Sequence, residues 1–289
     1  MAAALNRVVP AQSGNQFGIL VYHRVAEAEP RSTPPTWNVS PDRLHRQLEG
    51  LLNAGYTALP LRRALSAHAA KEPLPARSFA VTFDDGYANN LTRALPVLER
   101  LQVPATIFLA TAFLDSPEPF PSDDWPLAGA PAVPGDSWRP LTSDEVHQLL
   151  RNPLIEIGCH THTHRDFRQI PEEFRQDLEH SLGVLGERFG IAEPTFAFPF
   201  GYATPEMLKI AEQVGLLCAL TTEPEPVPAQ ASPFGWGRFR ANQFDSPSTL
   251  RGKLDGWYSR LSREGGPNSA LGKLGTADSA SPPAPGAVA

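Results

Sequence analysis

The sequence is poor in features that would place it in several large protein classes. Its only two cysteines, Cys159 and Cys218, cannot form a disulfide framework and lie in apolar segments, as expected of buried thiols. No apolar run reaches about 18 residues, so no transmembrane helix is predicted. Residues 1–16 lack the apolar centre and basic flank of a secretory signal. The chain as written is therefore expected to be cytoplasmic, while a misassigned start would leave periplasmic or extracellular export open.

Positive charge and nucleotide-binding motifs are also scarce. The 25 lysines and arginines face 31 acidic residues, giving a net charge of −6. This balance argues against nucleic acid and anionic membranes as partners. The sequence contains no G-x-S-x-G elbow, no phosphate-binding P-loop and no G-x-G-x-x-G fingerprint, which excludes the common serine-hydrolase, P-loop and dinucleotide-binding classes.

The 289 residues suffice for one large domain with a full core. We expect an N-terminal segment at 1–17, one folded domain at 18–261, and a disordered tail at 262–289, which is small, polar and free of aromatic residues after Ser262. The stretch at about 113–140 is rich in proline and shows no clean period, so it is predicted to be an insertion over one face.

Apolar runs of strand length alternate with segments of helical spacing. Strands are predicted at 18–23, 78–83, 105–110, 154–158, 195–198 and 216–221. Helices are predicted at 41–54, 61–69, 89–101, 142–151, 171–189 and 204–214, and the one at 89–101 is expected to be interrupted or restarted at Pro96. This alternation is typical of a parallel α/β fold. About seven strands in one domain favour a (β/α) barrel, with an open sheet as the alternative.

Two aspartates follow the predicted strand at 78–83. Carboxylates at the carboxyl end of a core strand lie where α/β folds place their chemistry. Because successive strand side chains point to opposite faces, Asp84 and Asp85 can share one site only if the chain bends there, and Gly86 permits a bend. The alternative is a solvated Asp-Asp-Gly turn.

Three histidines follow the predicted strand at 154–158. If the segment turns helically, His160 and His164 would lie on one side of it and could bind one divalent cation. Imidazole suits zinc and neighbouring transition metals. A catalytic zinc site uses three protein ligands, so Asp85 is the candidate for the third, which leaves Asp84 as a general base. A solvated loop is the alternative for the histidines.

These motifs resemble, in order, those of the polysaccharide deacetylase family, carbohydrate esterase family four. The matching segments are ILVYHRV at 19–25, TFDDG at 82–86, VPATIFL at 103–109, IEIGCHTHTH at 155–164 and FPFG at 198–201. The resemblance covers roughly residues 18–240, and the YHRV segment is similar to that of poly-N-acetylglucosamine deacetylases. It implies a distorted seven-stranded (β/α) barrel and a metal-dependent hydrolase that removes N-acetyl groups from an amino-sugar polymer.

The resemblance also implies roles for individual residues. Asp85, His160 and His164 match the metal ligands, for zinc or alternatively cobalt or nickel, and Asp84 matches the catalytic base. The backbone N–H of Phe200 matches the oxyanion donor, and Thr161 and Arg238 are expected near the oxyanion or substrate. His162 occupies a variable position and is not expected to bind the metal.

Two departures from the family pattern stand out. Ala197 occupies the position of the arginine that orients the catalytic aspartate, and Arg238, Arg240 or Arg165 are the candidates to replace it. The C-terminal Leu-x-His is absent, since no histidine follows His180. The resemblance makes His23 the substitute general acid, with a structural role as the alternative.

The expected substrate is an acetylated carbohydrate. The alternatives are a hydrolase of O-acetyl esters or small cyclic amides, and a non-catalytic carbohydrate-binding or assembly protein. Trp125, Trp138 and Trp236 are predicted in exposed loops, where they would stack on sugar rings or, equally, pack into the core.

Overall fold

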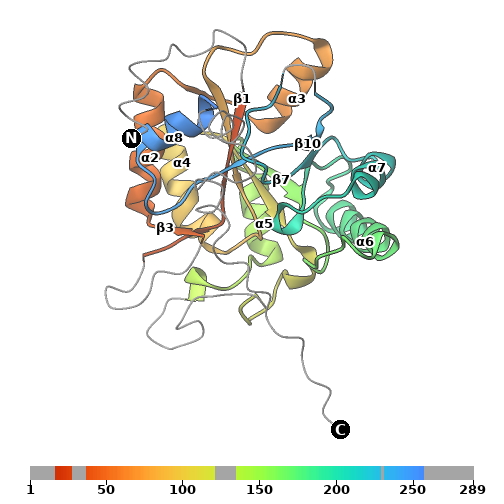
Figure 1. The fold of residues 1–289 in the computed structure, drawn as a ribbon. Helices are drawn as coiled ribbons and strands as arrows, with labels where there is room; N and C mark the ends of the chain where they lie inside the picture. The colour runs from red at the N-terminus through yellow and green to blue at the C-terminus, as the bar shows by residue number, and fades with distance from the viewer. Residues whose placement is uncertain (1–16, 28–36, 121–134, 229–230, 257–289) are drawn as a thin grey trace, which may run out of the picture.

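One large parallel sheet organises the fold (Figure 1). Its strands are β1 (Phe17–Tyr22), β4 (Thr57–Ala58), β5 (Ser78–Phe83), β6 (Ala105–Leu109), β7 (Ile155–Cys159), β8 (Phe196–Ala197), β9 (Ala219–Leu220), β10 (Phe234–Trp236) and β11 (Phe239–Arg240). Their order in the sheet is β10-β9-β8-β7-β6-β5-β1-β11, and β4 also pairs with β5. The computed structural model describes residues 17–27, 37–120, 135–228 and 231–256. The predicted tail and the segment before Phe17 lie outside these residues.

The two edges of the sheet come from one short stretch of chain. β10 pairs with β9 and β11 pairs with β1, yet only Gly237 and Arg238 separate β10 from β11. The segment 234–240 therefore reaches both edges and curves the sheet into a barrel. Counted as one interrupted strand, it joins β1, β5, β6, β7, β8 and β9 to give seven strands. The predicted parallel α/β barrel is confirmed.

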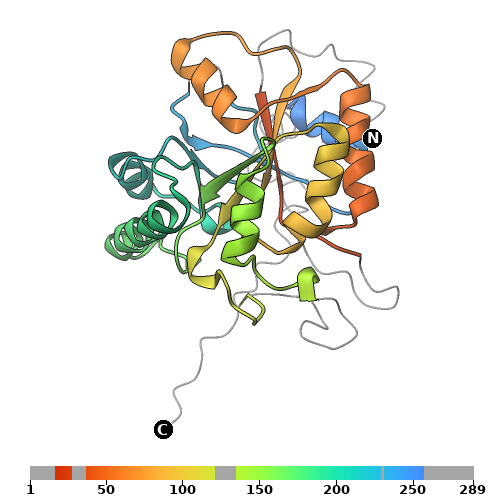
Figure 2. The same cartoon turned by 180° about the vertical axis from the view of Figure 1, so that it is seen from behind.

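Helices cover the outside of this sheet. They are α2 (Pro41–Asn53), α3 (Leu61–Ala70), α4 (Leu95–Leu101), α5 (Ser143–Leu150), α6 (Pro171–Phe189), α7 (Pro205–Gln213) and α8 (Pro247–Leu254). Four single turns lie between them: η1 (Asn90–Ala94), η2 (Thr111–Phe113), η3 (Gly135–Ser137) and η4 (Pro199–Gly201). Figure 2, which views the molecule from behind, shows α2, α4 and α5 side by side in front of the sheet. A small parallel pair, β2 (Arg24–Val25) and β3 (Asn38–Val39), lies beyond the carboxyl end of β1.

Local sequence signals explain most helix boundaries. The hydroxyl of Ser40 accepts the N–H of Arg43 at the start of α2, and Thr142 and Glu145 form a reciprocal capping box on α5. The helical stretch predicted at 89–101 is a π-helical turn, η1, followed by α4, and the predicted restart at Pro96 falls in the first turn of α4. The strands β8 and β9 are shorter than their apolar runs predict.

Alternation along the strands separates the barrel interior from the layer under the helices. Phe79 and Val81 pack in the layer under the helices, whereas Ala80 joins an interior cluster with Phe108 and Trp236. α3 lies over the amino end of the barrel (Figure 1) and adds its own apolar side chains to this cluster.

Trp236 was expected either on an exposed loop or in the core, and the structure places it in the core. It is 2% exposed and its ring packs edge-on against Phe17 and His68. Trp138 is half-buried beside η3, and Trp125 lies outside the described residues. Both cysteines are free and buried, as predicted. Among the described helices, none combines the length and apolar character needed to cross a membrane.

Candidate active site

The aspartate pair lies at the carboxyl end of β5, and a backbone bend brings both side chains to one place. Thr82 and Asp84 continue the inward-facing row of β5, and the N–H of Asp84 donates to Tyr22 O at 2.9 Å. The bend begins at Asp85, one residue before the glycine that was expected to permit it. Asp85 has φ of 71°, and Gly86 follows with φ of 77°. The Gly86 N–H closes the turn on Asp84 O at 2.9 Å.

Asp84 is held by Arg238, which lies at the seam between β10 and β11. Its guanidinium donates Nη1–H to Oδ1 at 2.7 Å and Nη2–H to Oδ2 at 2.8 Å. The same group donates to Thr82 Oγ1 at 3.2 Å and to Thr221 O at 3.0 Å. The Arg238 side chain is fully buried, so it orients Asp84 but offers no surface to a substrate.

The histidine motif leaves β7 in a bend that is not helical, contrary to the predicted helical turn. Thr161 has φ of 66° and His164 φ of 53°, and the His164 N–H donates to Thr161 Oγ1 at 3.1 Å. Both imidazoles nevertheless converge on Asp85: the distance to its Oδ1 is 3.5 Å from His160 Nε2 and 3.2 Å from His164 Nε2. Thr161 is fully buried, so its hydroxyl shapes the loop and does not reach a substrate.

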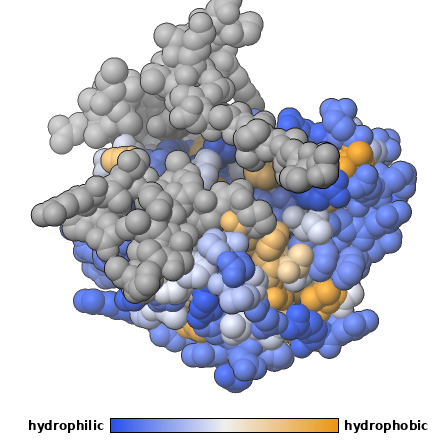
Figure 3. Space-filling model, turned by 90° about the horizontal axis from the view of Figure 1, so that it is seen from below, coloured by the Kyte–Doolittle hydropathy of each residue, from blue (hydrophilic) through white to orange (hydrophobic). Residues whose placement is uncertain are grey.

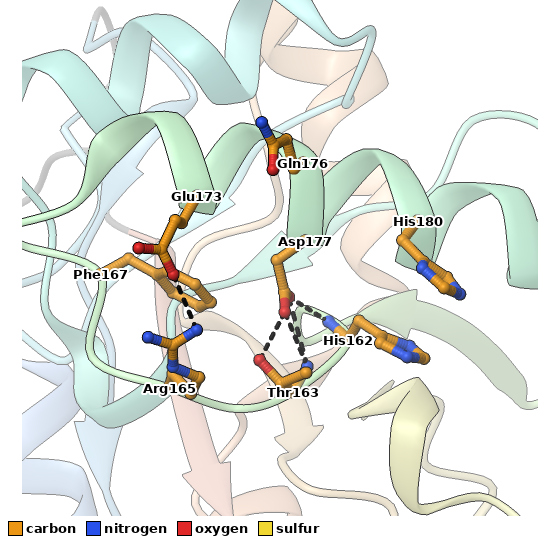
Figure 4. A pocket seen from close by; sticks show the side chains of 8 residues that line it. All are labelled: His162, Thr163, Arg165, Phe167, Glu173, Gln176, Asp177 and His180. Atoms are coloured by element: carbon orange, nitrogen blue, oxygen red, sulfur yellow. Dashed lines mark hydrogen bonds and ion pairs between the residues drawn. The ribbon is translucent and has the colours of Figure 1, made fainter.

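Helix α6 holds this loop through hydrogen bonds that the loop donates to Asp177 (Figure 4). Asp177 accepts the N–H of His162 at 2.6 Å and that of Thr163 at 3.1 Å, and it also accepts the Thr163 hydroxyl. The ring of His162 points away from Asp85, stacks on His180 at 4.0 Å and lies 2.9 Å from Thr111 Oγ1 through its Nδ1. His162 therefore lines a separate, open pocket against α6.

His160 is oriented by the residue that departs from the family pattern. Its Nδ1 lies 2.7 Å from the carbonyl oxygen of Ala197, and assigning the proton to Nδ1 leaves the Nε2 lone pair directed at Asp85. A backbone carbonyl on the far nitrogen is the usual way in which proteins fix a metal-binding imidazole.

The three groups fit a divalent metal ion. Their ligand atoms all lie within 4.8 Å of one another. A tetrahedral zinc site with bonds of about 2.0–2.1 Å would separate its ligand atoms by about 3.3 Å, close to the observed 3.2 and 3.5 Å. Two imidazoles and one carboxylate, with Ala197 fixing one ring, form a donor set that suits zinc and its neighbours.

The pKa values of the two aspartates are lowered, whereas burial alone would raise them. Burial would raise the pKa of Asp84, but the charges of Arg238 and His160 and the Arg238 hydrogen bonds lower it below its usual value. Burial is likewise outweighed at Asp85, where hydrogen bonds from His160 and His164 hold the pKa well below its usual range. Burial would lower the pKa of His160, yet Asp84 and Asp85 raise it. Both carboxylates are therefore ionised at neutral pH.

His23 lies just after β1 and borders the same site. Its ring stacks on Trp37, with centroids 5.2 Å apart and an interplanar angle of 28°. Its backbone oxygen accepts Asn90 Nδ2–H at 2.8 Å. Burial lowers the pKa of His23, and the charges of Asp85 and Asp84 offset this only in part.

Phe200 lies against His164, one of the three side chains that could hold a metal. Its ring meets that of His164 edge-on at 4.8 Å, and 43% of the residue is exposed. Its φ of 59° turns the backbone so that, within the described part of the chain, the Phe200 N–H has no acceptor. This N–H is free to bind an oxyanion.

The other candidate arginines lie elsewhere. Arg165 pairs with Glu173 at 2.9 Å in the pocket of Figure 4, away from Asp84. Arg240 is exposed, and its guanidinium lies 4.4 Å over the ring of Trp37. Of the three candidates, Arg238 therefore holds Asp84.

Backbone strain is concentrated in this site. Of the nine non-glycine residues with positive φ in the described ranges, four lie here: Asp85, Thr161, His164 and Phe200. Such conformations cost about 1–3 kcal/mol each and persist only where surrounding contacts fix them. The barrel therefore holds the site in place before a ligand arrives.

Sequence reasoning missed Asp177 and Trp37. Asp177 lies on the predicted helix 171–189, but nothing in its spacing shows that it binds the loop at 162–163. Trp37 follows a proline-rich stretch of the sequence, and its contact with His23 depends on the pairing of β2 with β3. Neither residue carries a local signal.

Comparisons with known proteins agree with these motifs. A family model described as polysaccharide deacetylase matches residues 71–219. The chain is 29% identical over 147 residues to the poly-beta-1,6-N-acetyl-D-glucosamine N-deacetylase of Escherichia coli, covering 51% of this chain but only 21% of that relative. It is 22% identical over 236 residues to the protein of that name from Staphylococcus aureus, covering 78% of this chain and 74% of the relative.

Solved structures with the same fold include two bacterial proteins. IcaB from Ammonifex degensii gives a TM-score of 0.70 at 21% identity, covering 83% of this chain and 98% of that one. The Streptococcus pyogenes deacetylase PplD, in complex with acetate, gives a TM-score of 0.68 at 20% identity with the same coverage. These likenesses establish the fold.

Proposed function

The chain belongs to the polysaccharide deacetylase family, and from this we propose that it hydrolyses N-acetyl groups on an amino-sugar polymer. The observation that carries the proposal is the convergence of Asp85, His160 and His164 beside a buried, ionised Asp84. The names of the relatives from Escherichia coli and Staphylococcus aureus point to β-1,6-linked N-acetylglucosamine as the polymer.

Asp85, His160 and His164 would hold the metal, for which zinc fits the donor set best and cobalt or nickel are alternatives. When bound, such an ion supplies Lewis-acid polarisation and lowers the pKa of water. Ala197 and Asp177 support this role by fixing the ring of His160 and the loop that follows it.

Asp84 would act as the general base. It lies 4.0 Å from His160 Nε2 and therefore next to the ligand group, and its low pKa keeps it ionised. Arg238 uses both oxygens of the carboxylate, so Asp84 can take a proton only along a lone pair that Arg238 leaves free. This fixes the direction from which water approaches the acetamide carbon.

Phe200 and His23 would complete the reaction. Attack by water places negative charge on the acetamide oxygen, and the free N–H of Phe200 is available to bind it. The C–N bond then breaks, the electron pair passes to nitrogen, and His23 delivers the proton that releases an amine and acetate. The position of His23 beside Asp84 and Asp85 supports this role.

An acetate-release assay tests the proposal. Zinc-loaded protein should release acetate from β-1,6-linked N-acetylglucosamine oligomers in preference to acetylated xylan or small cyclic amides. Asp84→Asn should abolish turnover while metal content by elemental analysis stays at one ion per chain, and His160→Ala should lose the metal. Preferential cleavage of the ester or the cyclic amide, or no acetate from any substrate, would overturn the proposed activity.

A further inference from the structure

An exposed cation stands at the rim of the proposed active site. Arg240 ends β11, and its guanidinium lies 4.4 Å over the ring of Trp37, which in turn stacks on His23. Seen from below in Figure 3, the carboxyl-end face shows apolar surface within hydrophilic surroundings. Trp37 and Phe200 are two of the exposed large apolar side chains of the described residues, at 41% and 43%.

Arg240 also reaches the side of the site on which Phe200 lies. Its Nη2–H donates to Thr222 Oγ1 at 3.5 Å, and the Thr222 hydroxyl donates to Phe200 O at 3.4 Å. The guanidinium therefore lies between Trp37, which stacks on the proposed acid His23, and Thr222, which contacts the proposed oxyanion donor Phe200. If the acetamide group of a polymer lay between His23 and Phe200, a neighbouring sugar would pass near Arg240.

The charge of Arg240 has no partner at ion-pair distance. Within the described ranges no carboxylate lies within 4.0 Å of it, and Asp84 and Glu223 act on it only from farther away. Arg168 offers a contrast on the same molecule: it lies 3.8 Å over the ring of Tyr202 but pairs with Asp166 at 2.6 Å. The two arginines make similar aromatic contacts and differ in net local charge.

We propose that Arg240, fixed over Trp37, forms a subsite for the sugar adjacent to the one being deacetylated, and that this subsite excludes a cationic glucosamine. The inference rests on the proposed deacetylase function and narrows its substrate. An N-acetylated neighbour is neutral and is accepted, whereas a neighbour that has already lost its acetyl group carries an ammonium and is repelled. The enzyme would then act on acetylated stretches and leave its products spaced along the polymer.

Two trisaccharides test this specificity. Both are β-1,6-linked with an N-acetylated central sugar, and their flanking sugars carry either N-acetyl groups or free amines. Loss of the central acetyl group is followed by NMR at pH 6, where the amines are protonated, with zinc-loaded protein. At low ionic strength we expect kcat/KM to favour acetylated flanks by about fivefold or more, and the ratio should shrink in about 0.5 M salt.

Variants separate the charge of Arg240 from other causes. Arg240→Gln should bring the ratio of the two substrates toward one, Arg240→Lys should keep most of the preference, and Arg168→Gln should keep all of it. Equal rates for the wild type, a preference that survives Arg240→Gln, or one that Arg168→Gln removes equally would overturn the subsite and leave the deacetylase function standing. No acetate from either trisaccharide would overturn both.

Discussion

Replacing Arg238 by methionine should lower the free energy of unfolding by about 3–5 kcal/mol, because it leaves a buried carboxylate without its partner. The side chains of Arg238 and Asp84 are 0% and 4% exposed, and two hydrogen bonds of 2.7 and 2.8 Å join them. Arg238→Lys keeps the charge but loses the planar fork, so a smaller loss of about 1–3 kcal/mol is expected. Denaturant unfolding, followed by fluorescence and circular dichroism together, measures both.

A double-mutant cycle isolates the pair from general damage to the barrel. Asp84→Asn combined with Arg238→Met should be clearly less destabilising than the sum of the single changes, since neither charge remains uncompensated. Arg240→Gln, at the exposed end of the same segment, is the matched control and should change stability by at most about 0.5 kcal/mol. A loss under about 1 kcal/mol for Arg238→Met, or additive single changes, would refute the pairing.

The same pair predicts how stability depends on pH. The pKa of Asp84 in the folded state lies below its ordinary value of 3.8. A depressed pKa contributes stability above the unfolded pKa, and this contribution is lost as pH falls through the folded pKa. The free energy of unfolding should therefore fall as the pH drops below about 4. Arg238→Met should show a smaller dependence over that range, and an unchanged dependence would assign it to other carboxyls.

Three further predictions concern single residues. His23→Ala should lower kcat on an N-acetyl substrate by about 10²–10⁴-fold but barely affect 4-nitrophenyl acetate, whose leaving group departs without a proton; equal losses on both would exclude a role as acid. Asp177→Ala should weaken metal binding by about 10–100-fold, as loss of an outer contact to the ligand loop predicts. Glu173→Ala, on the same helix, is its control, and equal metal affinities measured by competition with a chelator would contradict the role of Asp177. Gly237→Ala should reduce activity and stability, because its Cβ would lie 2.3 Å from the backbone oxygen of Glu223. Gly183→Ala on α6 meets nothing within 4 Å and should be neutral or stabilising, by up to about 1 kcal/mol; similar effects of the two glycine changes would show that the close approach does not matter.

Elements with a local signal were predictable from the sequence. The helical spacing of Phe174, Leu178 and Leu185 predicts α6, whose ends are marked by Pro171 and Gly190. The apolar run ending at Phe83 predicts β5. α8 was missed although Ser246 precedes Pro247 in the same cap pattern that marks α2 and α7. The sequence therefore carries a signal for this helix as well.

Contacts between distant segments were not predictable in this way. Arg238 could not be chosen over Arg240 or Arg165 from sequence, because its pairing with Asp84, 154 positions away, depends on how the segment 234–240 closes the barrel. Alternation alone points Arg238 and Arg240 the same way. The break at Gly237 and Arg238 between the two pairings changes this, so that Arg238 is buried and Arg240 exposed.

The same closure explains how Asp84 is held without an arginine at position 197. Ala197 lies in the interior cluster with Phe108, and the guanidinium of Arg238 lies 5.7 Å from the Phe108 ring centroid. The two oxygens of one carboxylate accept one forked guanidinium, so a second arginine from β8 would have to displace Arg238 or stay buried and unpaired. A small side chain at 197 avoids that conflict, while its backbone oxygen still orients His160. The alanine at position 197 therefore leaves the carboxylate of Asp84 to the guanidinium of Arg238, which reaches it from between β10 and β11.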